Sequence, residues 1–216
     1  MTFEEIVLAK LSKEQDDRAT RIRSGMWNPS SLGRCYRNQF FNRKNEPETE
    51  PKDLGFLKRM KLGKFIHQYA QECYPVECSE KKVSRDNLLG YYDLVYEGKV
   101  IDIKSVSEWE FNRISVKGYN VEKQKETNCL QVCSYAWMSG IKKAGLVFIG
   151  ICPELPSKEF EINVDNFIPK IEEELKILNG YWDKGELPPA IPRAYFGKDC
   201  VYCGWRTKCN KLEGKI

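Results

Sequence analysis

The sequence predicts an α/β fold in which a mixed central sheet is flanked by helices. Three observations predict it: apolar residues recur at helical spacing over 62–73, two strand-like segments joined by a turn occupy about 83–105, and a continuous apolar run fills 144–151. A chain of 216 residues can bury a substantial core, whereas two independent domains would each be small. We therefore expect one domain over 1–216.

The expected elements follow one another along the chain in an order typical of mixed α/β domains. In chain order they are a helix over 3–23, a short helix over 31–41, an exposed Pro- and Glu-rich loop over 45–52, a helix around His67, a hairpin over 83–105, a connection over 106–122, a helix over 129–137, a buried strand over 144–151 and a helix over 165–184. They divide the domain into a helical N-terminal region (1–60), a core (61–185) and a cysteine-bearing tail (186–216).

Two acidic residues and a lysine mark the predicted hairpin. Asp93 closes the segment 90–93, and Asp102 and Lys104 lie in the segment 100–104. Because alternate side chains of a strand share a face, Asp102 and Lys104 point the same way. Two carboxylates beside an ammonium group suit metal-dependent phosphodiester cleavage, in which the acids hold a divalent cation. A hairpin with exposed charges would contain the same residues.

Two helices carry further candidate residues. His67, the one histidine of the chain, lies beside a predicted buried stripe that contains Leu62, Phe65, Ile66, Tyr69, Ala70 and Cys73. A neutral imidazole is a common metal ligand, although a lone helical histidine is more often packed or solvated. Gln131 and Tyr135 are four residues apart on the next helix and share one face. They could offer an amide and a phenol to a substrate, or simply form a polar helix face.

The cysteines form a second pattern. Cys200, Cys203 and Cys209 are closely spaced near the C-terminus, and Cys35 lies far upstream. Nine cysteines, an odd number, in a chain with no signal-peptide pattern argue against a disulfide framework. Three neighbouring thiolates and one distant thiolate could bind zinc or an iron–sulfur cluster. The remaining cysteines are expected to be small buried hydrophobes: Cys73, Cys78, Cys129, Cys133 and Cys152.

Taken in order, four short motifs resemble the series found in RecB-like nucleases of the PD-(D/E)XK (restriction-endonuclease-like) superfamily. They are Gly63-x-x-x-His67, Gly90-x-x-Asp93, Asp102-x-Lys104 and Gln131-x-x-x-Tyr135. The resemblance, which covers about residues 30–210, implies that His67, Asp93 and Asp102 bind Mg²⁺ or Mn²⁺, with the Ile103 carbonyl as a further ligand. It implies that Lys104 is the catalytic lysine and that Gln131 and Tyr135 place the substrate.

The resemblance also bears on the cysteines. RecB-like nucleases that join the C-terminus to the region before the core by four cysteines do so with a 4Fe–4S cluster, and this chain resembles them, including the Cas-four family of CRISPR-associated exonucleases. It implies that Cys35, Cys200, Cys203 and Cys209 hold such a cluster, which clamps the helical N-terminal region to the tail. Cys35 is followed by Tyr36 rather than by a small residue or proline, and the tail is short, so the match to that family is incomplete.

The activity implied by the resemblance is single-stranded DNA exonuclease activity, with 5′-to-3′ polarity and some endonuclease activity among the family's properties. It would serve CRISPR adaptation, with adaptation proteins as partners, or the replication, recombination or repair of viral or mobile-element DNA with the corresponding proteins. Two alternatives stay open: a catalytically inactive nucleic-acid-binding module and a zinc-stabilised interaction module. No apolar run approaches membrane-spanning length, and we expect a cytoplasmic protein, in the host cytoplasm if viral.

The connection over 106–122 interleaves aromatic and basic residues directly after the predicted catalytic strand. It contains Trp109, Phe111, Arg113 and Tyr119. Such residues can stack on the bases of single-stranded DNA while binding its phosphates, or they can pack the connection onto the domain.

Overall fold

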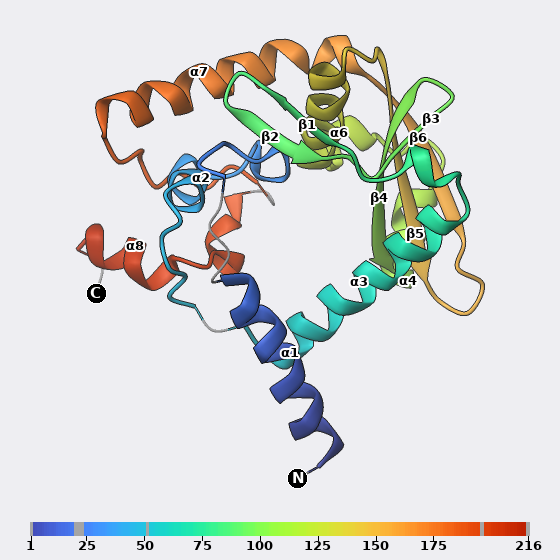
Figure 1. The fold of residues 1–216 in the computed structure, drawn as a ribbon, viewed down its shortest axis with the longest axis horizontal. Coiled ribbons are helices and arrows are strands. Elements are labelled where there is room, and N and C mark those ends of the chain that lie inside the picture. The colour runs from blue at the N-terminus through green and yellow to red at the C-terminus, as the bar shows by residue number, and fades with distance from the viewer. Residues whose placement is uncertain (1, 20–23, 51, 195–196, 215–216) are drawn as a thin grey trace.

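The computed structural model describes residues 2–19, 24–50, 52–194 and 197–214 (Figure 1). Its main sheet has four strands in the order β3-β4-β5-β6, which are Leu94–Tyr96, Lys99–Ser107, Lys143–Ile151 and Ser157–Asn163. The central pair β4 and β5 is parallel, and each outer strand pairs antiparallel to its neighbour. The predicted mixed sheet is therefore confirmed.

The predicted hairpin over 83–105 is wrong in one respect, because the structure divides this segment into two hairpins. Strands β1 (Lys82–Arg85) and β2 (Leu88–Tyr91) form a separate two-stranded sheet, and β3 pairs with β4. Asp86 and Asn87 make the additional turn with positive φ angles of 50° and 64°, a conformation that Asp and Asn tolerate better than most residues. Asp93 lies in the bend between β2 and β3.

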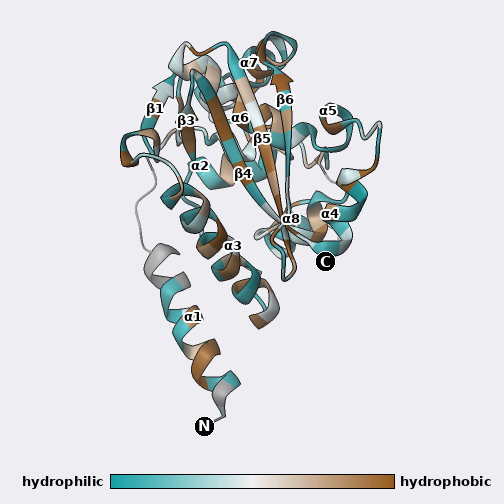
Figure 2. Cartoon of the chain, turned by 90° about the vertical axis from the view of Figure 1, so that its right-hand side faces the viewer, coloured by the Kyte–Doolittle hydropathy of each residue, from teal (hydrophilic) through white to brown (hydrophobic). Residues whose placement is uncertain are grey.

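Helices cover both faces of the sheet. The α-helices are α1 (Phe3–Ala19), α2 (Tyr36–Arg43), α3 (Leu54–Glu72), α4 (Glu108–Ser115), α5 (Val121–Gln124), α6 (Glu126–Ser139), α7 (Ile168–Lys184) and α8 (Arg206–Leu212), and the short 3-10 helices are η1 (Pro29–Ser31), η2 (Val76–Cys78), η3 (Val164–Asn166) and η5 (Asp199–Tyr202). Residues 20–23 of the expected first helix lie outside the described residues. Figure 2 shows α1 projecting away from the sheet, next to α3. No helix among the described residues is both long and apolar enough to cross a membrane.

The two faces of β4 are buried against different helices. Ile101 and Ile103 pack with Ile66 of α3 in one apolar cluster, whereas Val100 packs on the other side with the residues of α6. Alternation along β4 therefore separates the two clusters, and it directs Asp102 and Lys104 toward α6.

The buried stripe predicted for α3 is narrower than expected. Ile66 is buried, but Leu62, Phe65, Tyr69 and Cys73 are exposed. Residues 62, 65 and 69 all lie to one side of Ile66 around the helix, about 40–100° from it, and remain exposed, so helical spacing alone overestimated the apolar contact area.

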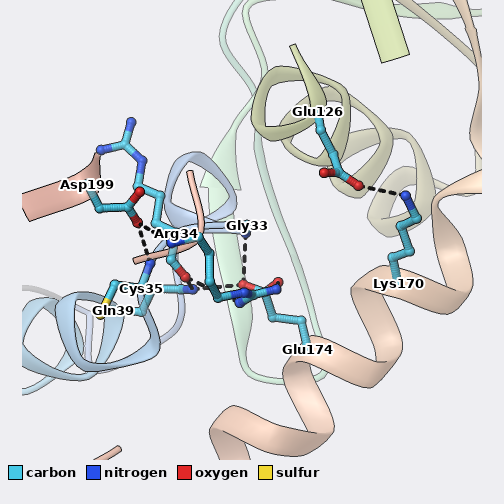
Figure 3. Close-up of polar contacts among 9 residues, drawn as sticks. Gly33, Arg34, Cys35, Gln39, Glu126, Lys170, Glu174 and Asp199 are labelled. Carbon is cyan, nitrogen blue, oxygen red and sulfur yellow. Dashed lines mark hydrogen bonds and ion pairs between the residues drawn. The ribbon is translucent and has the colours of Figure 1, made fainter. Parts of the chain in front are cut away.

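Buried carboxylates fasten the N-terminal region to the rest of the chain. Glu174 of α7 accepts hydrogen bonds from the Gly33 backbone N–H at 2.9 Å and from Gln39 Nε2 at 2.7 Å, and it pairs with Arg193 at 2.9 Å (Figure 3). Asp199 Oδ2 accepts the Cys35 backbone N–H at 2.8 Å. These contacts fix the loop before α2 against both α7 and the tail.

Candidate active site

The site begins at an open edge of the sheet. Strand β3 pairs with β4 only as far as Leu94 opposite Ile101, so no strand among the described residues lies opposite the Ile103 backbone N–H on this side of β4. The Asp93 carboxylate takes that place, accepting the Ile103 N–H at 2.7 Å. The N–H and C=O of one strand residue point to the same side of the strand, so the Ile103 carbonyl faces this edge too.

A chain of polar side chains joins β4 to α6. Lys104 Nζ lies 2.8 Å from Asp102 Oδ2 and donates a hydrogen bond to Gln131 Oε1 at 3.1 Å. Gln131 Nε2 in turn donates to the Tyr135 hydroxyl at 3.4 Å. Burial raises the pKa of Tyr135, so its phenol stays neutral. The spacing of four residues on α6 is what places Gln131 and Tyr135 on the face toward Lys104.

Asp102 is the least solvated charged group of the site, with 1% of its surface exposed. Its partner among the described residues is Lys104, whose ammonium lies 2.8 Å from Oδ2, and no other described residue donates a hydrogen bond to either carboxylate oxygen. Burial raises the pKa of Asp102 to about 6, Lys104 opposes that rise, and the nearby Asp93 adds to it. With one ammonium as its partner, this buried carboxylate is only partly compensated, and it keeps oxygen lone pairs that a divalent cation could bind.

His67 completes the group from the other face. It projects from α3, and its Nδ1 lies 3.4 Å from Asp93 Oδ2. Asp93 is thus close to both His67 and Ile103, and Asp102 directly precedes Ile103 on β4. Within the described part of the chain, however, no group of three or more His, Cys, Asp or Glu side chains is arranged to hold a metal ion. The three expected ligands are neighbours, but their side chains are not gathered into such a group.

Two glycines explain why the motifs need this residue type. A Cβ atom on Gly90 would lie 2.7 Å from Tyr135 Cε1 and 2.9 Å from Pro29 Cγ, so only glycine lets β2 approach α6 this closely. A Cβ atom on Gly63 would lie 3.3 Å from Ser105 Oγ, a tight contact at which α3 crosses β4. Both glycines bring a helix of the site close to a strand.

The four expected cluster cysteines converge elsewhere in the fold. They line one small cavity of about 30 Å³, bordered by the N-terminus of α2, by η5 and by α8; the four are Cys35, Cys200, Cys203 and Cys209. Burial raises the pKa of the Cys35 thiol, while the backbone N–H groups of Asn38 and Arg37 lower it. These four cysteines are among the described side chains, none of which form a group arranged to hold a metal ion. The expected iron–sulfur clamp is therefore not shown.

Polar groups also point at two of the sulfurs. Arg37 Nη1 donates to Cys209 Sγ and Asn38 Nδ2 donates to Cys203 Sγ, both at 3.4 Å. Hydrogen bonds of this kind stabilise thiolates and tune the sulfur ligands of metal centres. The donor set and its hydrogen bonds therefore fit a group bound by thiolates.

The remaining cysteines differ in how deeply they are buried. Cys129 and Cys133 are buried on α6 as expected, and burial raises the pKa of Cys129 to about 12. Cys73 is exposed, contrary to expectation, because it follows the end of α3 on the solvent side, and Cys78 and Cys152 are half-buried.

Sequence patterns did not identify the residues that hold Cys35 in place. Glu174 lies in a run of three glutamates that resembles a solvated helix face, yet it is buried. Asp199 directly precedes Cys200, which is the one local signal that could have drawn attention to it. Arg37 and Asn38 likewise gave no signal beyond their closeness to Cys35.

No protein-family model matches the chain, and no curated protein matches it. Solved structures do. The chain is similar to the structure described as SSO0001, with 17% identity and a TM-score of 0.55 over 97% of this chain and 96% of that one. It is similar to an alkaline exonuclease (LHK-Exo) from Laribacter hongkongensis, with 14% identity and a TM-score of 0.57 over 78% and 93% of the two chains.

A third similar structure is a phage-related exonuclease from Haemophilus somnus 129PT, with 15% identity and a TM-score of 0.55 over 69% of this chain and 79% of that one. LHK-Exo is also known in complex with dAMP. At these identities the likeness shows the fold, which this chain shares with exonucleases.

Proposed function

We propose that the chain is a metal-dependent DNA nuclease, acting as an exonuclease on single-stranded DNA. The observation that carries the proposal is the buried Asp102 carboxylate, whose one partner among the described residues is the Lys104 ammonium. The cost of burying such a carboxylate is removed when it binds a divalent cation. The fold shared with exonucleases supports the same conclusion.

Asp93, Asp102, the Ile103 carbonyl and His67 are the groups that would hold Mg²⁺ or Mn²⁺. Oxygen donors predominate in this set, as both cations prefer, and a neutral imidazole is a common metal ligand. When bound, the cation polarises a phosphoryl oxygen and lowers the pKa of a bound water.

The protein's own groups position the reaction. Lys104 carries a positive charge to the phosphate and orients the attacking water, and its contacts with Asp102 and Gln131 hold it in place. Gln131 is fixed in turn by Tyr135, so the α6 pair sets the position of the lysine and of the substrate backbone.

We further propose that Cys35, Cys200, Cys203 and Cys209 hold a 4Fe–4S cluster. In support, the four cysteines line one cavity, and N–H groups already point at three of the sulfurs. The cluster would join α2 to the tail, and so reinforce the contacts of Asp199 and Glu174.

The single-domain organisation over 1–216 and a cytoplasmic location, in the host if viral, belong to the same proposal. So does work in CRISPR adaptation or in replication, recombination or repair of viral or mobile-element DNA. The proteins that copurify with the chain decide between these settings.

The proposal is tested with anaerobically purified protein, 5′- or 3′-labelled single-stranded DNA and Mn²⁺. We expect cleavage that EDTA abolishes, that is absent in Asp102→Ala, and whose product lengths reveal the polarity. Iron near four per chain, with a brown colour, is expected from the cluster. Zinc without iron, together with intact DNA, would instead support the zinc-stabilised interaction module.

A further inference from the structure

One tryptophan of this chain is conspicuously exposed. Trp109 has 73% of its surface in contact with solvent, whereas Trp27, Trp137 and Trp205 are buried and Trp182 is half-buried. A large aromatic side chain that buries so little area contributes little to folding, and exposed aromatic residues often mark binding sites. The position of Trp109 relative to the candidate site therefore bears on its role.

Trp109 lies at the start of the helix that directly follows the strand of Asp102 and Lys104. The Ser107 hydroxyl caps that helix by accepting the Glu110 backbone N–H at 3.3 Å, which ends β4 and begins α4. Trp109 is the second residue of α4. It is thus held on regular structure, five residues after Lys104 and just beyond the end of the strand that carries it.

The position of α4 along the sheet is fixed by a close contact with β5. A Cβ atom on Gly150 would lie 2.9 Å from Phe111 Cγ, so the Phe111 ring rests directly on this glycine. Gly150 is two residues beyond Phe148, which pairs with Lys104 across the parallel strands. Two strand residues span about 7 Å, so α4 is anchored one such step beyond Lys104 along the sheet.

The surroundings of Trp109 provide a fixed cation. Arg113, one turn along α4, lies 5.9 Å from the Trp109 ring centroid. Glu110 holds the Arg113 guanidinium through two contacts of 2.9 and 2.7 Å, and it also pairs with Lys125 at the start of α6. The ring and the guanidinium are therefore neighbours, and the guanidinium is linked through Glu110 to Lys125, the N-cap residue of the helix that carries Gln131.

The other aromatic residues of the 106–122 connection have packing roles. Phe111 covers Gly150, and the half-buried Tyr119 contacts Phe160 at a ring-centroid distance of 6.0 Å. Of these three aromatic residues, Trp109 alone is exposed, whereas Phe111 and Tyr119 are half-buried.

We propose that Trp109 stacks on a base of a single-stranded DNA substrate close to the scissile phosphodiester, with Arg113 beside the neighbouring phosphate. This inference rests on the proposed nuclease function. Stacking on an aromatic side chain accepts every base, because each base has a π-face, and the adjacent guanidinium binds phosphate without reading sequence. Trp109 would thus secure unpaired DNA of any sequence.

The test measures binding without cleavage. An oligo(dT) strand is titrated into the protein in EDTA, and both tryptophan emission and the anisotropy of a labelled strand are followed. Wild-type emission should be quenched on binding. Trp109→Phe should lose this quenching while keeping affinity within a few-fold, and Trp109→Ala should bind roughly ten- to a hundred-fold more weakly. Val116→Ala, an exposed residue directly after α4, is the matched control and should bind like the wild type.

An abasic strand of the same length isolates the stacking. Without bases, the wild type and Trp109→Ala should bind it equally. The proposal is overturned if Trp109→Ala binds oligo(dT) as tightly as the wild type, if quenching persists in Trp109→Phe, or if the abasic strand shows the same loss.

The result of this binding test can be distinguished from the result of the test of the nuclease proposal. DNA cleavage with unchanged kinetics in Trp109→Ala removes the stacking role and leaves the nuclease intact. Quenching that depends on Trp109, in a protein that cleaves no DNA under any metal, establishes the stacking and removes the nuclease.

Discussion

The Asp93 carboxylate accepts the backbone N–H of Ile103 at 2.7 Å, at the edge where β3 ends. A side chain thus provides the hydrogen bond that a longer neighbouring strand would have provided. The same contact brings a negative charge to the strand that carries Asp102. Asp93 thus has two roles, a hydrogen bond that stabilises the fold and a negative charge at the candidate site, and different substitutions can remove one role without the other.

Asp93→Asn and Asp93→Ala are expected to differ in stability but not in activity. Asn keeps an oxygen for the Ile103 N–H but removes the charge, so its stability should stay near the wild-type value. Ala leaves that N–H unpaired and should cost about 1–2 kcal/mol. Both should reduce cleavage by at least about 100-fold, since both remove a metal ligand. Urea unfolding and cleavage rates measure the two effects, and full activity in Asp93→Asn would contradict the assigned role.

Asp102→Asn should stabilise the metal-free protein at neutral and higher pH. Burial raises the pKa of Asp102 from 3.8 to about 6, so between these values the folded chain binds a proton that the unfolded chain releases. Stability contributed by this group therefore falls as pH rises through that window and stays low above it. The neutral amide avoids this cost, and we expect a gain on the order of 1–3 kcal/mol at pH 8 that disappears near pH 4.

Urea unfolding in EDTA at pH 4, 6 and 8 measures this gain. Glu159→Gln is the control, because Glu159 is an exposed partner of Lys99 and its loss should change stability by less than about 1 kcal/mol. An Asp102→Asn protein less stable than the wild type at pH 8 would mean that Lys104 already compensates the buried charge.

Gly90→Ala should disturb the site from outside it. The added methyl would press on Tyr135 and Pro29, displacing α6 from β2 at a cost of about 1–3 kcal/mol. Because Tyr135 holds Gln131 and Gln131 holds Lys104, cleavage should fall more steeply than stability. Gly180→Ala is the matched control. A Cβ atom there meets nothing within 4 Å, and in the middle of α7 it should add about 0.5–1 kcal/mol of stability.

Local patterns predicted much of the sheet and the faces on which four of the candidate residues lie. Strand alternation placed Asp102 and Lys104 on one face, and a spacing of four did the same for Gln131 and Tyr135. These rules succeed because each depends on backbone geometry over a few residues.

Contacts over long sequence separations could not be predicted in this way. The partners of Glu174 in the N-terminal region are 135 and 141 residues away, and no local pattern distinguishes this glutamate from its exposed neighbours. The exposed flank of α3 failed for a related reason, since helical spacing gives the direction of a stripe but not the width of the surface that covers it.

If the four cysteines hold a cluster, a substitution that removes the cluster should destabilise the tail and leave cleavage at the active site intact. Cys203→Ser should lower the iron content well below four per chain, reduce the thermal midpoint by several degrees, and make residues 197–214 sensitive to protease, because the tail loses its link to α2. Divalent-metal-dependent cleavage should persist in the folded fraction, since Cys203 lines the cysteine cavity and not the Asp102 site. Cys152→Ser, in the turn between β5 and β6, should keep both iron and midpoint. Full iron content in Cys203→Ser, or equal losses in both variants, would remove the assignment of these cysteines.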